Sequence, residues 1–220
     1  MLKPLAFSTA FVAQHYGNLG DTYLDYFNKC GFAPILLTKN NYKEVLADCS
    51  GLVFSGGSDL TPTLFGDKFK GSVRCNKDLD LFEISVLEHA LSKNKKIFGI
   101  CRGMQLIARW FLANYTELRD YFYFAQDIKG HIGVNHGVIS YSSGKEYQVN
   151  SFHHQGLIRF DEVKKPVFVE GKMFNPVFYS PFYQDQHLIE GLYVGENVHG
   201  VQWHPEVLND VKYFEAFMRK

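Results

Sequence analysis

Cys101 is the residue best suited to chemistry, because of the turn that its neighbours predict. It stands two residues after Gly99 and two residues before Gly103, in the glycine–x–nucleophile–x–glycine pattern of α/β enzymes, with cysteine in place of serine. Glycine is expected at both positions because a Cβ atom there would collide with a crossing strand or helix. A strand at 96–100 and an amphipathic helix at 104–111 would place the thiol at the positive end of a helix dipole, which favours the thiolate. A cysteine after an apolar strand is usually a core residue, but the paired glycines and the helix favour a nucleophile.

His204 and Glu206 form a second candidate pair, two residues apart. At the end of a strand, that spacing would put both side chains on one face. Glu206 could then hold the imidazole in one tautomer while the other ring nitrogen faces the thiol of Cys101. The chain order places the carboxylate after the histidine, unlike the order in α/β-hydrolases. A His-Pro-Glu tripeptide alone is more often a turn, but with the cysteine turn in the same chain we favour catalysis.

A glycine-rich turn supplies candidates for an oxyanion hole. Ser55, Gly56 and Gly57 follow an apolar run at 51–54. A cysteine that attacks a carbonyl builds negative charge on the oxygen, which needs fixed hydrogen-bond donors. We predict the backbone amide of Arg102, at the start of the helix, as one donor and the amide of Gly57 as the other. Taken alone, the Ser-Gly-Gly sequence would indicate only a turn after a strand.

The composition is that of one globular domain covering residues 1–220. Hydrophobic residues make up 46% of the chain and charged residues 21%, with 23 Lys and Arg against 23 Asp and Glu. This neutral balance predicts no binding to nucleic acid and none to a membrane surface. The four cysteines show no CxxC pair and no zinc-like spacing, so we expect reduced thiols in a cytoplasmic protein. Residues 5–13 faintly resemble a short signal peptide, but a buried first strand explains them better.

The hydrophobic pattern predicts an α/β fold whose character changes about halfway along the chain. Up to the cysteine turn, strands alternate with helices, which indicates a parallel sheet covered on both faces. The expected strands are 5–11, 34–37, 51–54 and 96–100, and the expected helices are 21–30, 78–92 and 104–111. From about residue 138 short strands follow one another, which indicates antiparallel additions at 137–141, 146–150, 157–160, 167–170 and 192–194. A strand at 199–206 and a helix at 207–218 complete the prediction.

Four ordered motifs give the chain a specific resemblance to a known family. They are Gly-Ile-Cys-Arg-Gly-Met-Gln at 99–105, Ser-Gly-Gly-Ser-Asp-Leu-Thr-Pro at 55–62, Val-Asn-Ser-Phe-His-His-Gln at 149–155 and Gly-Val-Gln-Trp-His-Pro-Glu at 200–206. With these motifs the chain resembles class I glutamine amidotransferases, and more narrowly their stand-alone γ-glutamyl hydrolase branch. The resemblance implies a flavodoxin-like three-layer α/β/α sandwich, mostly parallel with antiparallel additions. It also implies Cys101 as nucleophile, His204 as base and then acid, and Glu206 as the residue that orients His204.

The resemblance further implies how a γ-glutamyl group is held. The side chain of Gln105 would position the α-amino-acid end of the substrate, and the backbone at Ser151 and Phe152 would receive its carboxylate. His153 and His154 lie beside that segment, where a structural role and a substrate contact are equally expected. Two further histidines, His131 and His136, lie on a polar stretch that in this branch faces the leaving group, although solvated loop histidines are the simpler interpretation.

Two departures from the branch concern the leaving group. After the cysteine helix, residues 111–115 replace the usual Gly-Gly turn, and the acidic run at 78–83 lacks an expected arginine between its acids. Both sites would border the region that distinguishes one leaving group from another. The departures leave the catalytic motifs unchanged and put the identity of the substrate in question.

The function that the resemblance implies is hydrolysis of a γ-glutamyl amide through a glutamyl thioester on Cys101, with no metal and no cofactor. Three leaving groups are known to us among stand-alone members: γ-aminobutyrate, a folyl polyglutamate tail and a nucleotide phosphoramidate. The chain is rich in Phe, Tyr, Lys and Asn, as in proteins of AT-rich bacterial genomes, and on that cue we expect γ-glutamyl-CDP-amidate, used in capsular phosphoramidate synthesis. The aromatic stretch at 174–183 could stack on a nucleobase, but packing is its simpler use.

Two other classes of function compete with this one. A glutaminase subunit would pass ammonia to a separate synthetase, and a redox sensor would carry a cysteine on the same kind of turn without catalysis. The sensor would not need His204 and Glu206 two residues apart, so their presence argues against it. The oligomeric state is left open.

Overall fold

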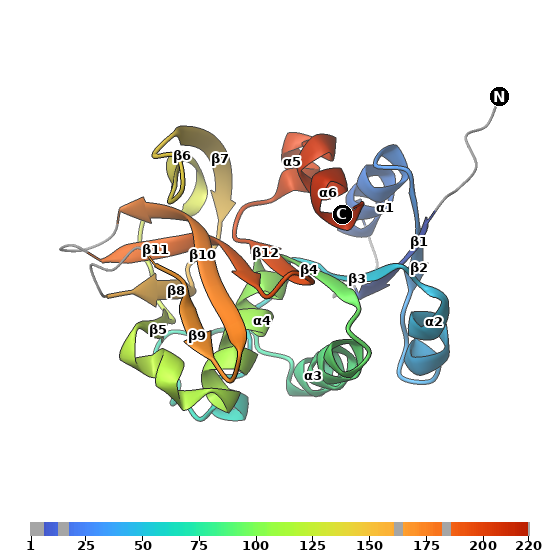
Figure 1. Ribbon diagram of the computed structural model, residues 1–220, viewed down its shortest axis with the longest axis horizontal. Coiled ribbons are helices and arrows are strands. Elements are labelled where there is room, and N and C mark those ends of the chain that lie inside the picture. Colours follow the sequence, from blue (N-terminus) through green and yellow to red (C-terminus); the bar gives the residue numbers. More distant parts are fainter. Residues whose placement is uncertain (1–6, 13–17, 161–164, 182–185, 220) are drawn as a thin grey trace.

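One long, curled β-sheet with helices on both faces forms the frame of the protein (Figure 1). The computed structural model describes residues 7–12, 18–160, 165–181 and 186–219. Neighbouring strands of the first half of the sheet pair in parallel. In spatial order they are β2 (Phe32–Leu36), β1 (Phe7–Val12), β3 (Gly51–Phe54), β4 (Lys96–Ile100) and β12 (Val198–Val201).

The second half of the sheet is antiparallel and continues from β12. Its main path consists of β11 (His187–Val194), β10 (Lys172–Pro181), β6 (Ile132–Ser140) and β7 (Glu146–Phe152). Off that path, β8 (Gly156–Arg159) pairs with both β11 and β5 (Phe122–Ala125), and β9 (Val167–Val169) pairs with β10. The prediction of a parallel core with antiparallel additions is confirmed.

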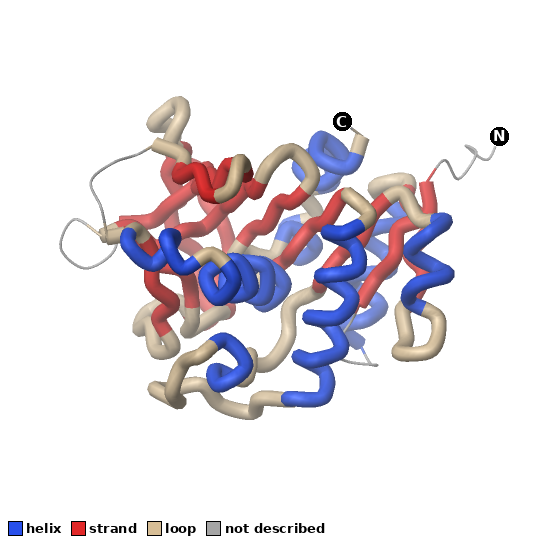
Figure 2. The backbone as a smooth tube through the Cα atoms, turned by 60° about the horizontal axis from the view of Figure 1, so that its bottom comes forward, coloured by secondary structure: helices blue, strands red, loops and turns tan. Residues whose placement is uncertain are grey.

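The helices form the two outer layers (Figure 2). One face carries α1 (Asn18–Lys29), α5 (Pro205–Leu208) and α6 (Val211–Met218), and the other carries α2 (Tyr42–Asp48), α3 (Lys77–Ser92) and α4 (Arg102–Asn114). Two short 3-10 helices, Pro62–Phe65 and Thr116–Asp120, lie in connections on the α4 side. The buried apolar side chains form two large clusters, one under each helical layer. The predicted three-layer α/β/α arrangement is therefore confirmed.

Several predicted boundaries need correction. The stretch with His131 and His136, predicted as a loop, is largely strand, because β6 begins at Ile132 and pairs with β7. The strand predicted at 199–206 ends at Val201, and the closing helix is divided by Asn209, whose φ of 54° interrupts the helix between α5 and α6. The hydrophobic pattern did not predict α2, β5 or β10.

The aromatic stretch at 174–183 mostly forms β10, in which Phe174 and Tyr179 pack in the core. Residues 5–6 of the first predicted strand and residues 182–183 of the aromatic stretch lie outside the described residues.

All four cysteines lie within the described residues and are thiols. Among the helices that the structure describes, none combines the length and the apolar character needed to cross a lipid bilayer.

Candidate active site

Cys101 occupies a strained turn between β4 and α4. Its φ of 50° and ψ of −105° lie outside the regions that most side chains adopt. A Cβ atom on Gly99 would lie 2.6 Å from backbone atoms of Gly103 and Met104, and one on Gly103 would strike the carbonyl oxygen of Phe54 on β3. Both glycines are thus required by the close approach of β3 and β4 to the first turn of α4, as the spacing predicts.

His204 and Glu206 come together, but not at the end of a strand as expected. His204 follows β12 by three residues and caps α5, and Glu206 stands in the first turn of that short helix. Nδ1 of His204 lies 2.6 Å from Oε1 of Glu206. The spacing of two works because Pro205 begins a helical turn, not because the two side chains share a face of a strand.

The side chain of Cys101 also interacts electrostatically with the imidazole of His204. Burial lowers the pKa of His204, but the negative charge of the Cys101 thiolate, the hydrogen bond to it and the pairing with Glu206 together raise this pKa to about 10. The site therefore favours an imidazolium beside the sulfur. A nucleophile next to an oriented acid–base group can attack a carbonyl and then protonate a leaving group.

Three residues that the sequence analysis did not single out hold this arrangement in place. Asn150 on β7 bonds both backbone groups of His204, accepting its N–H at 2.8 Å and donating to its carbonyl at 3.0 Å. Nε2 of Gln202 lies 3.5 Å from Sγ of Cys101. The hydroxyl of Tyr23 accepts the amide of Gly56 at 2.9 Å and lies 3.5 Å from Nδ1 of His204. Asn150 and Gln202 lie within motifs already recognised, which was the available signal.

The Ser55–Gly56–Gly57 turn lies directly against the imidazole of His204. A Cβ atom on Gly56 would be 2.8 Å from Cε1 of that ring. Because Tyr23 already accepts the amide of Gly56, the exposed Gly57 remains the candidate donor from this turn. Arg102 is the first residue of α4, where a backbone amide has no partner within the helix. The assignment of the Gly57 and Arg102 amides as oxyanion donors stays a prediction, and the local backbone favours it.

The side chain of Arg102 has a separate, structural use. It is buried and forms ion pairs with Asp80 and Glu83 of α3. The amide and hydroxyl of Thr61 also donate to the carboxylate of Asp80, at 2.8 and 2.6 Å. In the acidic run that we expected to border the leaving group, Asp80 and Glu83 are therefore buried in the core, whereas Asp78 is exposed. Phe111, from the other departure at 111–115, is also a core residue.

The residues predicted to hold the glutamyl group differ in how close they lie to Cys101 and His204. The amide nitrogen of Gln105 donates to the carbonyl of Gln155 at 3.0 Å and to Oε1 of Gln202 at 3.3 Å, beside Cys101. The ring of Phe152 is half exposed and stands edge-on to His204, with centroids 5.6 Å apart. Ser151 is buried, and its hydroxyl donates to the carbonyl of His131 at 2.6 Å.

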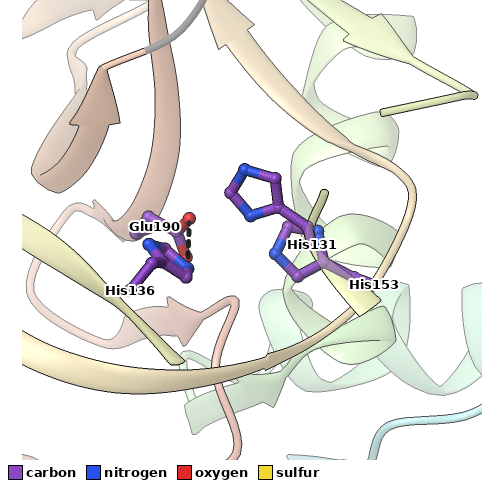
Figure 3. A group of neighbouring side chains, drawn as sticks. All are labelled: His131, His136, His153 and Glu190. Carbon is purple, nitrogen blue, oxygen red and sulfur yellow. Dashed lines mark ion pairs between the residues drawn. The ribbon is translucent and has the colours of Figure 1, made fainter. Parts of the chain in front are cut away.

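The four other histidines that the sequence predicted as site residues divide into two groups. His154 pairs with Asp59 at 3.0 Å. His131, His136 and His153 instead gather around Glu190 of β11 (Figure 3). Burial lowers the pKa of all three, that of His153 to about 3, and raises the pKa of Glu190 to about 8.

The structure contains an open depression of about 850 Å³, and Ser58, the residue that follows Gly57 in the sequence, is part of its lining. Its lining consists of Ser58, Asp59 and residues 73–78. The carboxylate of Asp59 is held by His154 and by the backbone amide of Val73. The cations Arg74 and Lys77 share the remaining lining with the carboxylate of Asp78.

Comparisons with known proteins bear on the family and the fold of the chain. The family model described as peptidase C26 matches residues 6–206. The putative glutamine amidotransferase-like protein YvdE of Lactococcus lactis is 26% identical over 88% of this chain and 83% of its own length. The γ-glutamyl-CDP-amidate hydrolase of Campylobacter jejuni is 26% identical over 75% and 64%. The glutaminase domain of Trypanosoma brucei CTPS, solved with bound acivicin, shares the fold with a TM-score of 0.61 at 14% identity, over 97% of this chain and 92% of that domain.

Proposed function

The chain belongs to the peptidase C26 family, and from that premise we propose that it hydrolyses a γ-glutamyl amide with Cys101, His204 and Glu206. The glutamine amidotransferase-like relatives support a hydrolase of amide bonds, with γ-glutamyl hydrolase or glutaminase activity. The observation that carries our assignment of residues is the position of the His204 imidazole, whose Nδ1 lies 2.6 Å from Oε1 of Glu206 and whose pKa is raised by the neighbouring Cys101.

The reaction proceeds through a covalent thioester. The thiolate of Cys101 attacks the γ-carbonyl carbon, and the amides of Gly57 and Arg102 donate to the oxyanion that forms. The imidazolium of His204 gives its proton to the departing nitrogen, the C–N bond breaks, and the glutamyl group stays on sulfur. His204 then takes a proton from water, which attacks the thioester and releases glutamate. Glu206 keeps the ring in one orientation through both steps.

The glutamyl end of the substrate requires polar partners, because its α-amino and carboxylate groups lose water on binding. The amide oxygen of Gln105 and the backbone at Ser151 and Phe152 are the groups that we assign to it. They lie on α4 and at the end of β7.

For the leaving group we propose a nucleotide phosphoramidate, with γ-glutamyl-CDP-amidate as the substrate and cytidine diphosphoramidate for capsule synthesis as the product. The relative of that name supports this choice. The depression lined by Ser58 supports it on physical grounds, since Arg74 and Lys77 also line it and cationic side chains recognise diphosphate groups.

Mass spectrometry of the purified chain with a panel of amides tests the proposal. The panel contains γ-glutamyl-CDP-amidate, γ-glutamyl-γ-aminobutyrate, a folyl polyglutamate and glutamine. We expect glutamate release from the first compound above all others and a glutamyl adduct on Cys101. Cys101→Ala should abolish both, while Cys49→Ala, which removes another buried thiol, should keep both. Glutamate release that survives Cys101→Ala or His204→Ala would contradict the assigned residues.

A glutaminase is the second candidate, because relatives of this chain are named glutamine amidotransferase-like. The glutamine sample separates the two functions. Ammonia released from glutamine faster than glutamate from any conjugate would identify a glutaminase and reject the nucleotide substrate.

A further inference from the structure

Four side chains that the hydrolase reaction does not use point toward one another on the antiparallel half of the sheet (Figure 3). His131 directly precedes β6, His136 lies within β6, His153 directly follows β7, and Glu190 lies on β11. Each offers one nitrogen or oxygen atom, and these four atoms all lie within 4.8 Å of one another. Three separate strands thus bring metal-ligating groups to one point.

The cluster contains a buried carboxylate whose charge is poorly compensated. Glu190 is completely buried. Its Oε1 accepts a hydrogen bond from the hydroxyl of Ser180 at 3.0 Å and lies 3.4 Å from Nε2 of His136, while its Oε2 has no hydrogen-bond partner. Burying a carboxylate costs much free energy unless a cation faces it. No lysine or arginine of the described residues forms an ion pair with Glu190, so the surroundings leave room for another positive charge.

The histidines are oriented as metal ligands commonly are. Nδ1 of His153 lies 2.9 Å from the carbonyl of Gln155, and Nδ1 of His136 lies 3.2 Å from the carbonyl of Gly137. A ring that donates its Nδ1–H to a carbonyl must present an unprotonated Nε2 with a free lone pair. In both residues that Nε2 atom is buried and has no hydrogen-bond partner. Two lone pairs and a carboxylate oxygen are therefore directed inward without protein donors to satisfy them.

We propose that His131, His136, His153 and Glu190 bind one divalent transition-metal ion, for which Zn²⁺ is the best fit. Three imidazoles and one carboxylate suit zinc, whereas Mg²⁺ and Ca²⁺ prefer oxygen ligands. Tetrahedral zinc with bonds of about 2.0–2.1 Å places its ligand atoms roughly 3.3 Å apart. The present separations reach that value through an inward movement of about 1.5 Å at most, which small side-chain rotations provide.

Four protein ligands complete a tetrahedral shell, which is typical of a structural zinc site. The ion would join β6, β7 and β11 at one point. Because Asn150 on β7 holds the backbone of His204, the ion would also steady the strand that positions the imidazole. This site departs from our expectation of no metal, and it does not depend on the proposed hydrolase reaction.

Zinc binding to the full chain tests the proposal directly. Untagged protein is stripped with a chelator, incubated with Zn²⁺, desalted and analysed by inductively coupled plasma mass spectrometry. We expect one zinc per chain for the wild type, and an affinity more than about 100-fold weaker for Glu190→Gln and His136→Ala, since loss of an outer hydrogen-bond partner alone costs ~10–100-fold. Zinc should also raise the melting temperature of the wild type but not of these variants.

Two controls keep the experiment decisive. His89→Ala removes a histidine on α3, outside the cluster, and should bind zinc like the wild type. Cys101→Ser should also retain zinc, which separates this site from capture of zinc by the thiolate. Glu190→Gln keeps the shape of the side chain and removes a buried charge, so circular dichroism should show it folded. Absence of stoichiometric zinc in the wild type, equal binding by Glu190→Gln, or loss of zinc in Cys101→Ser would each overturn the proposal.

Discussion

The imidazole of His204 is fixed by contacts from distant parts of the chain. Glu206 bonds its Nδ1, Asn150 bonds its backbone on both sides, and Gly56 lies against its Cε1 atom. The ring can therefore gain or lose a proton without changing its orientation. In the proposed reaction, that property lets the same group serve first as acid and then as base.

Replacing Cys101 by alanine should lower the pKa of His204 from about 10. The thiolate charge and its hydrogen bond are the largest contributions that raise this pKa, so burial should pull it down once they are removed. Because folding raises the pKa in the wild type, proton binding at His204 stabilises the fold fully below pH ~6.5 and ceases to do so as the pH rises through about 10. Histidine-ring NMR titration of wild type and Cys101→Ala measures the change. An unaltered His204 titration in the variant would mean that sulfur and imidazole do not interact.

Gly56→Ala should impair the reaction while leaving the fold intact. Its Cβ atom would lie 2.8 Å from Cε1 of His204 and 2.9 Å from the hydroxyl of Tyr23, so the imidazole must move. A displacement of roughly 1 Å at a reacting group can cost about 100-fold in rate. We expect kcat for glutamate release to fall by about 10- to 100-fold with little change in KM. Gly195→Ala, in a turn with open space around the added atom, serves as the control and should keep full kcat.

At the scale of elements, the turn at Cys101 depends on three segments that pack without side chains between them. Strands β3 and β4 approach the first turn of α4 so closely that only glycine fits at positions 99 and 103. This packing holds Cys101 at its positive φ, a conformation that costs about 1–3 kcal/mol and persists only where its surroundings enforce it. The nucleophile is thus positioned by backbone contacts.

Gly103→Ala should therefore destabilise the whole fold. The added Cβ atom would meet the carbonyl oxygen of Phe54 and lie 2.7 Å from its Cβ atom, and neither can move without shifting β3. We expect the free energy of unfolding in urea to fall by about 2–3 kcal/mol. Gly195→Ala, which has only its positive φ to strain, should cost about 1 kcal/mol. Equal losses in the two variants would show that the close approach at α4 does not exist.

Elements with strong local signals were predictable from the sequence, and those set by pairing were not. Strand β3 and helix α3 match their predicted ranges to within one residue, because an apolar run or a helical spacing marks them. The start of β6 was missed, since Gly133, Asn135 and His136 interrupt its apolar pattern, and the segment forms a strand by pairing with β7. The break at Asn209 was missed because an asparagine can also continue a helix.

The residues of the candidate site also divide into those that local sequence predicts and those that depend on how distant strands meet. The types and spacing of Cys101, His204 and Glu206 predicted them as site residues, and the structure places His204 beside both Glu206 and Cys101; their catalytic roles stay a prediction. Asn150 and Gln202 were not found, because their contacts depend on how β7 and β12 meet around the sulfur and imidazole. Glu190 lay in an apolar strand without any local signal, and its histidine neighbours come from two other strands.

At the scale of the whole molecule, the site lies where the two halves of the sheet join. The parallel half carries Cys101 at the end of β4, and β12 passes from it directly to β11 of the antiparallel half. The antiparallel half supplies Asn150. Helix α6 contributes Phe214, Phe217 and Met218 to the apolar cluster on its face of the sheet, but none of the residues assigned to the site.

Phe214→Ala separates the stability of the molecule from the chemistry of the site. The ring is fully buried, and its centroid lies 5.1–5.3 Å from the rings of Phe27, Phe32 and Phe98, which come from α1, β2 and β4. Its removal leaves a cavity among elements from both ends of the chain, so we expect the free energy of unfolding to fall by about 3–5 kcal/mol. Phe168→Ala, at a ring that is 68% exposed, should change it by less than about 0.5 kcal/mol. At a temperature where both variants are folded, kcat should equal that of the wild type, because the ring contacts of Phe214 within the described residues are with Tyr26, Phe27, Phe32 and Phe98 and with no site residue. A large loss of kcat without a loss of stability would place α6 in the catalytic machinery instead.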